Sequence, residues 1–328
     1  MKQKLLITGA SGFLGYHLIQ AALLQEYEVF GGVRKSSDTK HLHNSGVRLV
    51  EIDLADTDST KKMLEQNGIT HIIHAAALTK AKTESAYNFS NAQLTRNLAI
   101  AASQADTGIE KFIFISSLAA LGPSVNGEPV TEDNVPQPVT WYGKSKLLAE
   151  KYLCEITKLP FIGFRPTAVY GPREKDLLLL IKTVSKGFEI YIGNTEQKLS
   201  FVYVKDLAAL AINSLTSKII GEFYNISDGE VYNRYAFAEA VKKITGKKTM
   251  KLQLPLAFLK AIAASTDVLY SRSKNVPVLN KDKINEITAA NWSCSIAKSQ
   301  KELGFKPSYN LEKGIAESIQ WYKQNNWL

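Results

Sequence analysis

The sequence is poor in cysteine and lacks any long apolar run. Its two cysteines, Cys154 and Cys294, fit neither a metal-ligand spacing nor a redox motif. We therefore expect no metal and a reducing, cytoplasmic setting. No apolar stretch is long enough to cross a bilayer, and the first apolar stretch starts at Lys4, too early to follow a signal peptide. Stable membrane insertion is not expected.

The sequence also lacks repeats, low-complexity linkers and dense basic segments. Its formal net charge is +9, but the cations are scattered, and a pair such as Lys61-Lys62 is typical of a solvated helix face. Binding to nucleic acid is therefore not expected, because that function needs clustered cations on one surface. A length of 328 residues with 45% hydrophobic and 22% charged residues indicates a globular protein of about two lobes.

A glycine-rich turn follows the first apolar segment. Lys4–Thr8 is typical of a buried strand, and apolar residues from Phe13 onward recur at helical spacing. Between them the chain reads Gly9-Ala10-Ser11-Gly12, with Gly15 one turn later. A helix that begins at such a turn offers free N–H groups and a positive dipole end to a diphosphate. A purely structural tight turn is the alternative, and its position after the first strand favours phosphate binding.

Further apolar strands alternate with helices along the first half of the chain. Such strands, apolar throughout, predict a parallel sheet covered on both faces. We therefore predict an α/β fold: a Rossmann-type doubly wound parallel sheet, with a smaller and mostly helical C-terminal substrate lobe. The expected domains are 1–171 for the cofactor-binding part and 172–328 for the substrate lobe, interleaved because segments near 199–227 return to the sheet. The predicted strands are 4–8, 28–33, 47–52, 71–77, 111–117 and 161–165.

Two polar features are expected at the carboxyl edge of this sheet. Tyr142 and Lys146 lie four residues apart at the start of a predicted helix, so both side chains project from one face. An ammonium beside a phenol lowers the pKa of the phenol and makes it a better proton carrier at neutral pH. Ser116 and Ser117 end the fifth strand, where active residues of such sheets collect. Chance occurrence is the alternative for each feature alone, but these two features together with the glycine turn favour an enzyme.

These residues resemble the extended short-chain dehydrogenase/reductases, a family that includes NAD-dependent sugar-nucleotide epimerases and dehydratases. The resemblance covers nearly the whole chain. It rests on Thr8–Gly15, Asp53-Leu54, His74–Ala77, Asn91–Asn97 with Leu94 in place of the usual glycine, Ser117, Tyr142-x-x-x-Lys146, Arg165–Pro172 and Phe201–Leu207.

The resemblance implies a mechanism. Tyr142 would be the general acid/base, Ser117 would hold the reacting oxygen, and Lys146 would bind the nicotinamide ribose and lower the pKa of Tyr142. Together with the turn, it implies the following cofactor-binding residues: Gly9, Ser11, Gly12, Phe13, Leu14, Gly15, Asp53, Leu54, Ala75, Ala76, Ala77, Asn91, Ser116, Tyr142, Lys146, Pro166, Thr167 and Val169.

The segment after the second strand bears on the choice between NAD and NADP. Binders of NAD usually place an acid there to hold the ribose 2′-hydroxyl. This chain has Arg34 and Lys35 instead, and the first acid is Asp38. A guanidinium suits a 2′-phosphate, so we expect NADP to be preferred, although both cations are also compatible with a solvated loop.

The substrate is less well determined by the sequence. Pro166-Thr167-Ala168 stands where sugar-nucleotide members commonly have an asparagine, and together with the cations after the second strand it resembles the branch of hydroxysteroid dehydrogenases and dihydroflavonol-type reductases. The apolar stretch Leu254–Ala264 also fits that branch, or is simply a covering helix. We expect substrate contacts from Thr79, Lys80, Ala119, Arg173 and Tyr203.

The main prediction is an NAD(P)-dependent oxidoreductase that interconverts an alcohol and a ketone on a small-molecule substrate. The alternative is a nucleotide-sugar epimerase or dehydratase, and a more remote one is a non-catalytic cofactor sensor. The resemblance also implies a homodimer.

Overall fold

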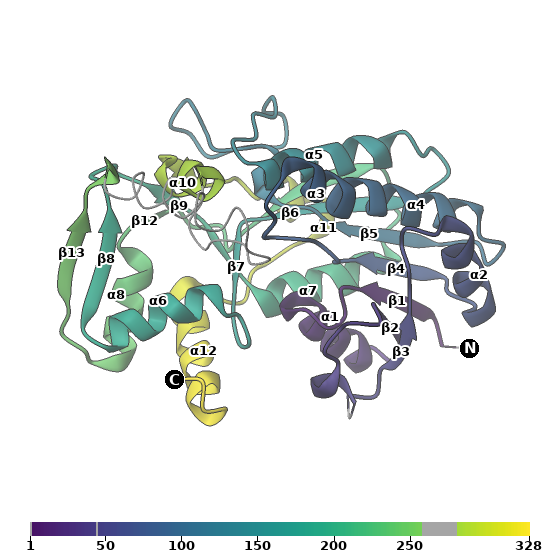
Figure 1. The fold of residues 1–328 in the computed structure, drawn as a ribbon, viewed down its shortest axis with the longest axis horizontal. Coiled ribbons are helices and arrows are strands. Elements are labelled where there is room, and N and C mark those ends of the chain that lie inside the picture. The colour runs from purple at the N-terminus through teal and green to yellow at the C-terminus, as the bar shows by residue number, and fades with distance from the viewer. Residues whose placement is uncertain (1, 44, 258–280) are drawn as a thin grey trace.

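The computed structural model of the chain describes residues 2–43, 45–257 and 281–328. Its centre is a seven-stranded parallel sheet in the order β11-β6-β5-β4-β1-β2-β3 (Figure 1). Every neighbouring pair is parallel, which confirms the predicted α/β doubly wound fold. The strands are β1 (Lys4–Thr8), β2 (Glu28–Val33), β3 (Arg48–Glu51), β4 (His71–His74), β5 (Lys111–Ile115), β6 (Phe161–Pro166) and β11 (Glu222–Ile226).

Helices cover both faces of this sheet (Figure 1). Leu5 and Ile7 of β1 pack in the same core as α1 and α7, whereas Leu6 points into the core under the other helices. Successive side chains of a strand point to opposite faces, so both sets must be apolar when both faces are covered. The helices are α1 (Phe13–Leu24) and α7 (Val204–Asn213) on one face, and α2 (Thr57–Asn67), α4 (Leu94–Gln104) and α5 (Trp141–Cys154) on the other.

The helical segment before β5 is interrupted. It begins as α3 (Glu84–Tyr87), passes through a π-helical segment at Asn88–Gln93, and continues as α4. A π-helical turn inserts an extra residue per turn and is frequent at functional sites. Here it contains Asn91, which is fully buried.

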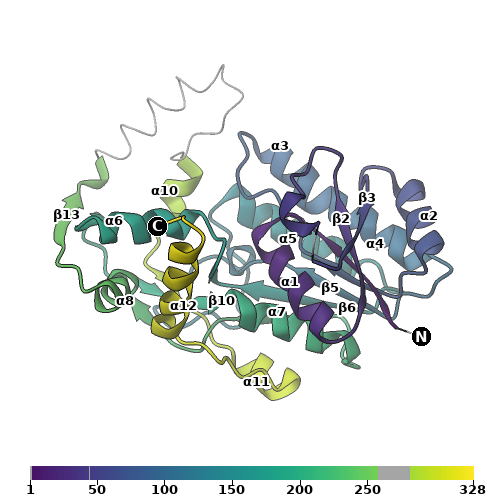
Figure 2. The ribbon, with the colours of Figure 1, turned by 90° about the horizontal axis from the view of Figure 1, so that it is seen from below.

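The C-terminal region surrounds an aromatic core of its own. Two short parallel strands, β7 (Ala168–Tyr170) and β10 (Phe201–Tyr203), bring Tyr170 and Tyr203 into it. In both ribbon views α12 lies beside α6 and α8 (Figures 1 and 2). These helices are α6 (Asp176–Ser185), α8 (Ala236–Thr245) and α12 (Leu311–Gln324).

Short strands make this region less helical than expected. A parallel pair, β8 (Phe188–Ile192) and β13 (Met250–Leu254), lies at the end of the molecule farthest from the large sheet (Figure 1). Three two-residue strands form another small sheet: β9 (Lys198–Leu199), β12 (Tyr232–Asn233) and β14 (Asn291–Trp292). The described residues also form α10 (Lys281–Thr288) and α11 (Ala297–Leu303), with 3-10 turns at Lys40–Leu42, Leu118–Ala120 and Ser214–Thr216.

The apolar stretch Leu254–Ala264 is only partly covered, because residues from 258 onward lie outside the described residues. Among the residues that the structure does describe, no helix is long and apolar enough to cross a membrane.

Candidate functional site

The strand order reverses between β1 and β4, and a pocket opens beside the carboxyl ends of these strands. Ligands of open α/β sheets bind at such a switch point. Of the residues expected to bind a cofactor, many line this pocket. The lining is Thr8, Gly9, Ser11, Gly12, Gly32, Val33, Arg34, Ser37, Ile52, Asp53, Leu54, Ala75, Ala76, Ala77, Leu78, Ser90 and Leu94.

The glycine turn has the geometry of a phosphate cradle. Gly9 has φ +70°, and a Cβ on it would lie 2.7 Å from the Ala76 backbone nitrogen. A Cβ on Gly15 would lie 2.1 Å from the Gly9 carbonyl oxygen, so this glycine lets α1 pack onto the turn. Gly12 precedes α1, and no side chain caps the first N–H groups of the helix. These groups and the open backbone fit a dinucleotide diphosphate. Phe13, Leu14 and Gly15 support the turn from outside the pocket lining.

The opposite part of the pocket lies between β2 and β3. Arg34 and Asp53 line it, whereas Lys35 is exposed and is not among the lining residues. The Arg34 backbone N–H donates to the Ser37 hydroxyl at 3.1 Å, which shapes the loop after β2. Arg34 is therefore the better placed of the two cations for a charge on an adenosine ribose.

A chain of buried hydrogen bonds connects the glycine turn to α5. His74 Nδ1 pairs with the Thr8 hydroxyl at 2.6 Å, and His74 Nε2 pairs with the Thr95 hydroxyl at 2.9 Å. The Asn91 amide nitrogen donates to the Ser145 hydroxyl at 3.0 Å and to the Leu78 carbonyl, and the Asn91 amide oxygen accepts from the Leu78 N–H. Asn91 is thus a fully buried support behind the pocket rather than part of its lining.

The start of α5 is held tightly against the turn that follows β5. Thr140 caps the helix by accepting from the Gly143 N–H at 2.9 Å. A Cβ on Gly143 would lie 2.2 Å from the Ala119 carbonyl oxygen, so only glycine allows this approach. The contact holds the segment that carries Ser117 against the start of α5, and the Ser117 side chain acts on the Tyr142 hydroxyl, where it lowers the pKa of Tyr142. Ser117 also accepts from the Ala119 N–H at 3.2 Å, which fixes its side chain.

The protonation of Tyr142 differs from the expectation. Burial is the main cause that raises the pKa of Tyr142 to about 12, and the charges of Glu286 and Tyr87 raise it further. A hydrogen bond from Ser117 lowers this pKa but does not outweigh the effect of burial. Lys146 does not offset this shift. Its ammonium donates to the Ile115 carbonyl at 2.8 Å and lies 4.8 Å from the centre of the Phe114 ring. Burial lowers the pKa of Lys146 to about 7, and Glu150 opposes that shift.

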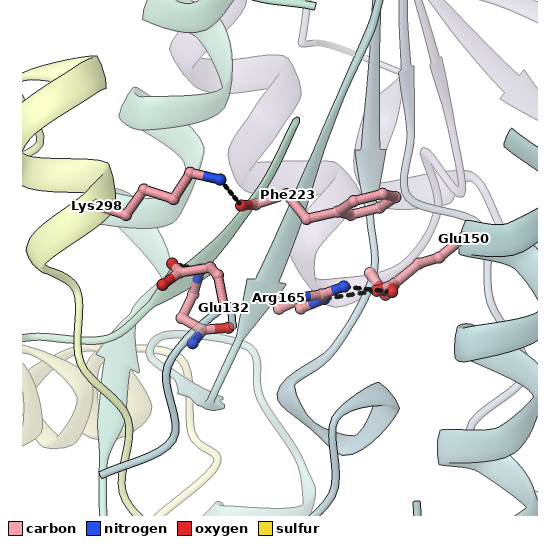
Figure 3. A network of polar contacts seen from close by, with 7 residues as sticks. Glu132, Glu150, Arg165, Phe223 and Lys298 are labelled. Atoms are coloured by element: carbon pink, nitrogen blue, oxygen red, sulfur yellow. Dashed lines mark hydrogen bonds and ion pairs between the residues drawn. The ribbon is translucent and has the colours of Figure 1, made fainter. Parts of the chain in front are cut away.

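Ser116 takes no part in the pocket lining. Its hydroxyl donates to Glu150 Oε1 at 2.5 Å, and Arg165 donates to the same carboxylate from Nε at 2.9 Å and from Nη2 at 2.7 Å. Figure 3 shows the guanidinium and the carboxylate facing each other, with the Phe223 ring close by. The structure therefore assigns Ser116 to a buried ion-pair network behind the site instead of to a cofactor contact.

The segment expected beside the nicotinamide runs along the junction of β6 and β7. Pro166 and Thr167 are buried, and the Thr167 N–H donates to the Ile226 carbonyl at 3.0 Å. Val169 is half-buried and packs against the core that contains α1. All three lie outside the pocket lining described above.

The expected substrate residues do not converge. Tyr203 is fully buried in the aromatic core, where a substrate cannot reach it. Arg173 has φ +76°, and its guanidinium lies 4.4 Å from the centre of the Tyr16 ring. Lys80 forms an exposed ion pair with Asp176 of α6 at 2.7 Å.

Two other expected substrate residues lie near the start of α5. Thr79 is exposed, and its carbonyl accepts from the Tyr87 hydroxyl at 3.2 Å. Ala119 contacts Gly143 through its backbone. Both are linked to the surroundings of Tyr142: Ala119 contacts the next residue along the chain, and Thr79 bonds to Tyr87, whose ring is 6.3 Å from that of Tyr142.

Several residues of the site were missed in the sequence. Thr8, Ser37 and Ser90 line the pocket. Glu150 carried a usable signal, because it follows Lys146 by one helical turn and must share its face. Glu286 of α10 affects the pKa of Tyr142 across a large sequence separation, which no local pattern indicates.

Known proteins resemble this chain over nearly its whole length. It is 29% identical to the UDP-glucose 4-epimerase of Vibrio cholerae, covering 99% of this chain and 97% of that protein. It is 28% identical to the decarboxylating sterol-4-alpha-carboxylate 3-dehydrogenase of Dictyostelium discoideum, covering 95% of this chain and 98% of that protein. The crystal structure of the Bordetella bronchiseptica enzyme WbmG in complex with NAD and UDP has the same fold. Its TM-score is 0.79 at 21% identity, with 100% of this chain and 97% of that chain covered.

The model of the family described as NAD dependent epimerase/dehydratase matches residues 5–227. That range contains the glycine turn, Ser117, Tyr142 and Lys146, and it ends just after β11 closes the large sheet. The chain therefore belongs to the NAD dependent epimerase/dehydratase family and is an enzyme of that family.

Proposed function

We propose that the protein oxidises a secondary hydroxyl of a nucleotide sugar to a transient ketone, as an epimerase or dehydratase. The observation that carries this proposal is the interaction of Ser117, which follows the carboxyl end of β5, with Tyr142 of α5. Both residues lie outside the lining of the pocket, which opens at the carboxyl ends of the parallel strands β1 and β4 of the same sheet. A bound nicotinamide supplies the hydride acceptor and donor. Tyr142 takes the proton of the substrate hydroxyl and later returns it, and Ser117 holds the oxygen that reacts.

Lys146 must assist this proton transfer. A phenol with a pKa of about 12 is almost fully protonated at neutral pH and must give up its own proton before it can accept that of the substrate, so the phenolate has to be stabilised. An ammonium has three donors, and the structure uses one of those of Lys146 for the Ile115 carbonyl. The other two are available for a cofactor ribose and for the phenolate. A general acid/base in such an environment contributes about 10²–10⁴-fold to the rate.

The epimerase or dehydratase reading is preferred over net alcohol/ketone oxidoreduction, which was the main prediction from the sequence. The family description and the relationship to UDP-glucose 4-epimerase support it. In such a reaction the hydride returns to the substrate, so no cofactor is consumed.

A net dehydrogenase is the second candidate. Pro166-Thr167-Ala168 follows β6 without an asparagine, and the relationship to a sterol dehydrogenase is almost as strong. A substrate with an apolar ring system would then be oxidised at the expense of free cofactor.

The cofactor balance of the purified enzyme separates the two candidates. We would incubate it with UDP-sugars, dTDP-sugars, sterols and small ketones, and follow reduced nicotinamide by absorbance and the products by mass spectrometry. Conversion of a nucleotide sugar without net change in absorbance supports the proposal. Stoichiometric reduction of added cofactor with a sterol or simple alcohol, and no turnover of any nucleotide sugar, would refute it in favour of the dehydrogenase.

We further propose that NADP binds more tightly than NAD. Support comes from Arg34, which lines the pocket at the end of β2, where no acid stands. Titration of both cofactors tests this, with Arg34→Ala expected to weaken NADP more than NAD. Tighter binding of NAD to the unmodified enzyme would contradict the proposal.

The division into a cofactor-binding part at 1–171 and a substrate lobe at 172–328 is likewise a proposal. It is supported by the separate aromatic core of the C-terminal region. The homodimer stays a prediction, which light scattering of the purified protein would test.

A further inference from the structure

A buried carboxylate lies directly behind Lys146. Glu150 is 3% exposed and follows Lys146, which is 2% exposed, by one turn of α5. Its oxygens accept from Ser116 at 2.5 Å and from two guanidinium nitrogens of Arg165 at 2.9 and 2.7 Å (Figure 3). A carboxylate so deeply buried needs such donors, because it has lost its hydration.

The partners of Glu150 keep it apart from the ammonium. Arg165 grips the carboxylate as a two-pronged fork, which fixes its plane and direction. The Lys146 ammonium is directed elsewhere, to the Ile115 carbonyl at 2.8 Å. The lysine therefore feels the negative charge of Glu150 without giving its remaining donors to it.

The other groups that face Lys146 supply no negative charge. From β4 comes His74, which burial keeps neutral by lowering its pKa to about 3. From β5 come the Phe114 ring and the Ile115 carbonyl. On α5 itself, Tyr142 is a neutral phenol at neutral pH. Arg165 of β6 is a cation turned toward Glu150. Among the described residues, Glu150 is thus the one anion that acts on this lysine.

We propose that Glu150 is a positioning residue whose charge keeps Lys146 protonated, while Ser116 and Arg165 hold the carboxylate away from the donors that the reaction needs. This inference rests on the proposed function of Lys146 in binding the cofactor and assisting Tyr142. It makes the buried ion pair part of the reaction machinery instead of a purely structural contact.

The test is the pH dependence of Glu150→Gln, which keeps the shape and removes the charge. Without the carboxylate, Lys146 loses its proton at a lower pH, so functions that need the ammonium fail earlier as pH rises. We expect the alkaline limb of reduced-cofactor affinity, followed by fluorescence titration from pH 6 to 9, to move down by about one pH unit or more. The alkaline limb of kcat/KM should move with it.

Glu189→Gln is the matched control. Glu189 is also buried, at 1% exposed, and is paired with Lys242 at 2.9 Å, but it belongs to β8 in the C-terminal region. Its replacement removes a comparable charge far from Lys146, so the pH profile should stay in place. A shift of equal size in this control would overturn the proposal.

A double-mutant cycle with Lys146→Met tests whether Glu150 acts through the lysine. In that background Glu150→Gln should cause no further shift, and an equal additional shift would refute the proposal. If Glu150→Gln leaves Arg165 unpaired and the protein does not fold, Glu150→Met with Arg165→Met removes both charges and should show the same early loss. An unchanged profile in either folded variant would refute the inference.

The same variants separate this inference from the proposed function. If Lys146→Met binds cofactor and turns over like the unmodified enzyme, the proposed function of Lys146 falls. If Lys146→Met is impaired but Glu150→Gln has the profile of the unmodified enzyme, only the positioning function of Glu150 falls.

Discussion

Two buried glutamates illustrate how differently the two regions of the molecule use charge. Glu150 lies under the large sheet's active edge and pairs with Arg165 at 2.7 Å. Glu189 belongs to β8, and its buried carboxylate accepts from the Tyr191 hydroxyl at 2.5 Å through one oxygen. Its other oxygen is bound by Thr249 and Lys242. Burial alone would raise the pKa of Glu189, but these hydrogen bonds lower it to about 2.

The difference between the pairs lies in their neighbours. Glu150 has a second buried cation, Lys146, within its field, one helical turn away on α5. All the donors around Glu189 are used to hold β8, β13 and α8 together. Burial of an ion pair therefore does not by itself indicate function. What distinguishes the surroundings of Glu150 is a third buried charge, Lys146, whose ammonium donates to the Ile115 carbonyl and not to the carboxylate.

The largest expected effect separates the two regions through their tyrosines. Tyr142→Phe should reduce turnover by about 10²–10⁴-fold, because the proton carrier is lost, while cofactor affinity stays nearly intact. Tyr191→Phe removes the hydroxyl that donates to the Glu189 carboxylate at 2.5 Å. This variant should lose about 1–3 kcal/mol of stability without a change in turnover per folded molecule. Steady-state kinetics and urea unfolding measure both. Normal turnover in Tyr142→Phe would exclude the assigned function of Tyr142.

A second contrast uses two glycines with nearly equal φ. Gly9, at +70°, has backbone atoms within 3 Å of a built Cβ, whereas Gly246, at +67° after α8, has open space around it. Gly246→Ala should cost about 1–2 kcal/mol, the price of the left-handed conformation alone. Gly9→Ala adds a clash with the backbone after β4 and should also abolish cofactor binding. Calorimetric titration and thermal unfolding would measure these effects, and intact cofactor affinity in Gly9→Ala would contradict the phosphate-cradle interpretation.

Acid should destabilise the two regions in different pH windows. Burial lowers the pKa of His74 from 6.5 to about 3, so the unfolded state takes up the proton first and stability falls as pH drops below about 6.5. We expect a loss of about 2 kcal/mol between pH ~6.5 and ~5. Glu189, whose folded pKa is about 2, contributes stability that is lost only below its ordinary value of 4.5. Urea unfolding of His74→Gln should lack the upper window and Glu189→Gln the lower one. Unchanged slopes would show that other groups govern acid unfolding.

The smallest effect concerns the ion pair that joins the regions. Lys80 and Asp176 are both exposed, so Lys80→Ala should cost only about 0–1 kcal/mol of stability. Lys80 is also a candidate substrate contact, so the KM of the Lys80→Ala variant for an anionic substrate would show whether the lysine binds substrate. An equal KM in Lys80→Ala and Asp176→Asn would limit the lysine to the ion pair.

The local features of the sequence predicted much of the large sheet. Aspartate is a preferred residue at the start of a helix, and the Asp56 side chain caps α2 by accepting from the Ser59 N–H at 2.9 Å. Tyr142 and Lys146 do lie on one face at the start of α5, since the spacing of a helix requires it. The β8–β13 pair was missed because Phe188 and Met250 pair across a long stretch of chain, and each strand alone has no distinctive pattern.

The functional geometry depended on contacts that no local pattern contains. The sequence indicates that Lys146 stands one turn from Tyr142, but the direction of its ammonium is set by Ile115 of β5. The pKa of Tyr142 is raised because burial is the dominant influence on its hydroxyl, and burial depends on packing between distant segments.

By itself, the sequence determined the fold class and the glycine turn, and it predicted Ser117, Tyr142 and Lys146 as the reacting side chains. These follow from periodicity, from the conformational freedom of glycine and from residue chemistry, all of which act over a few residues. The tertiary structure decided which polar groups share a buried environment: Ser117 with Tyr142, Asn91 with Ser145, and Ser116 with Glu150 and Arg165. The physical reason is that desolvation and charge act through space, so their strength depends on packing between segments far apart in the chain.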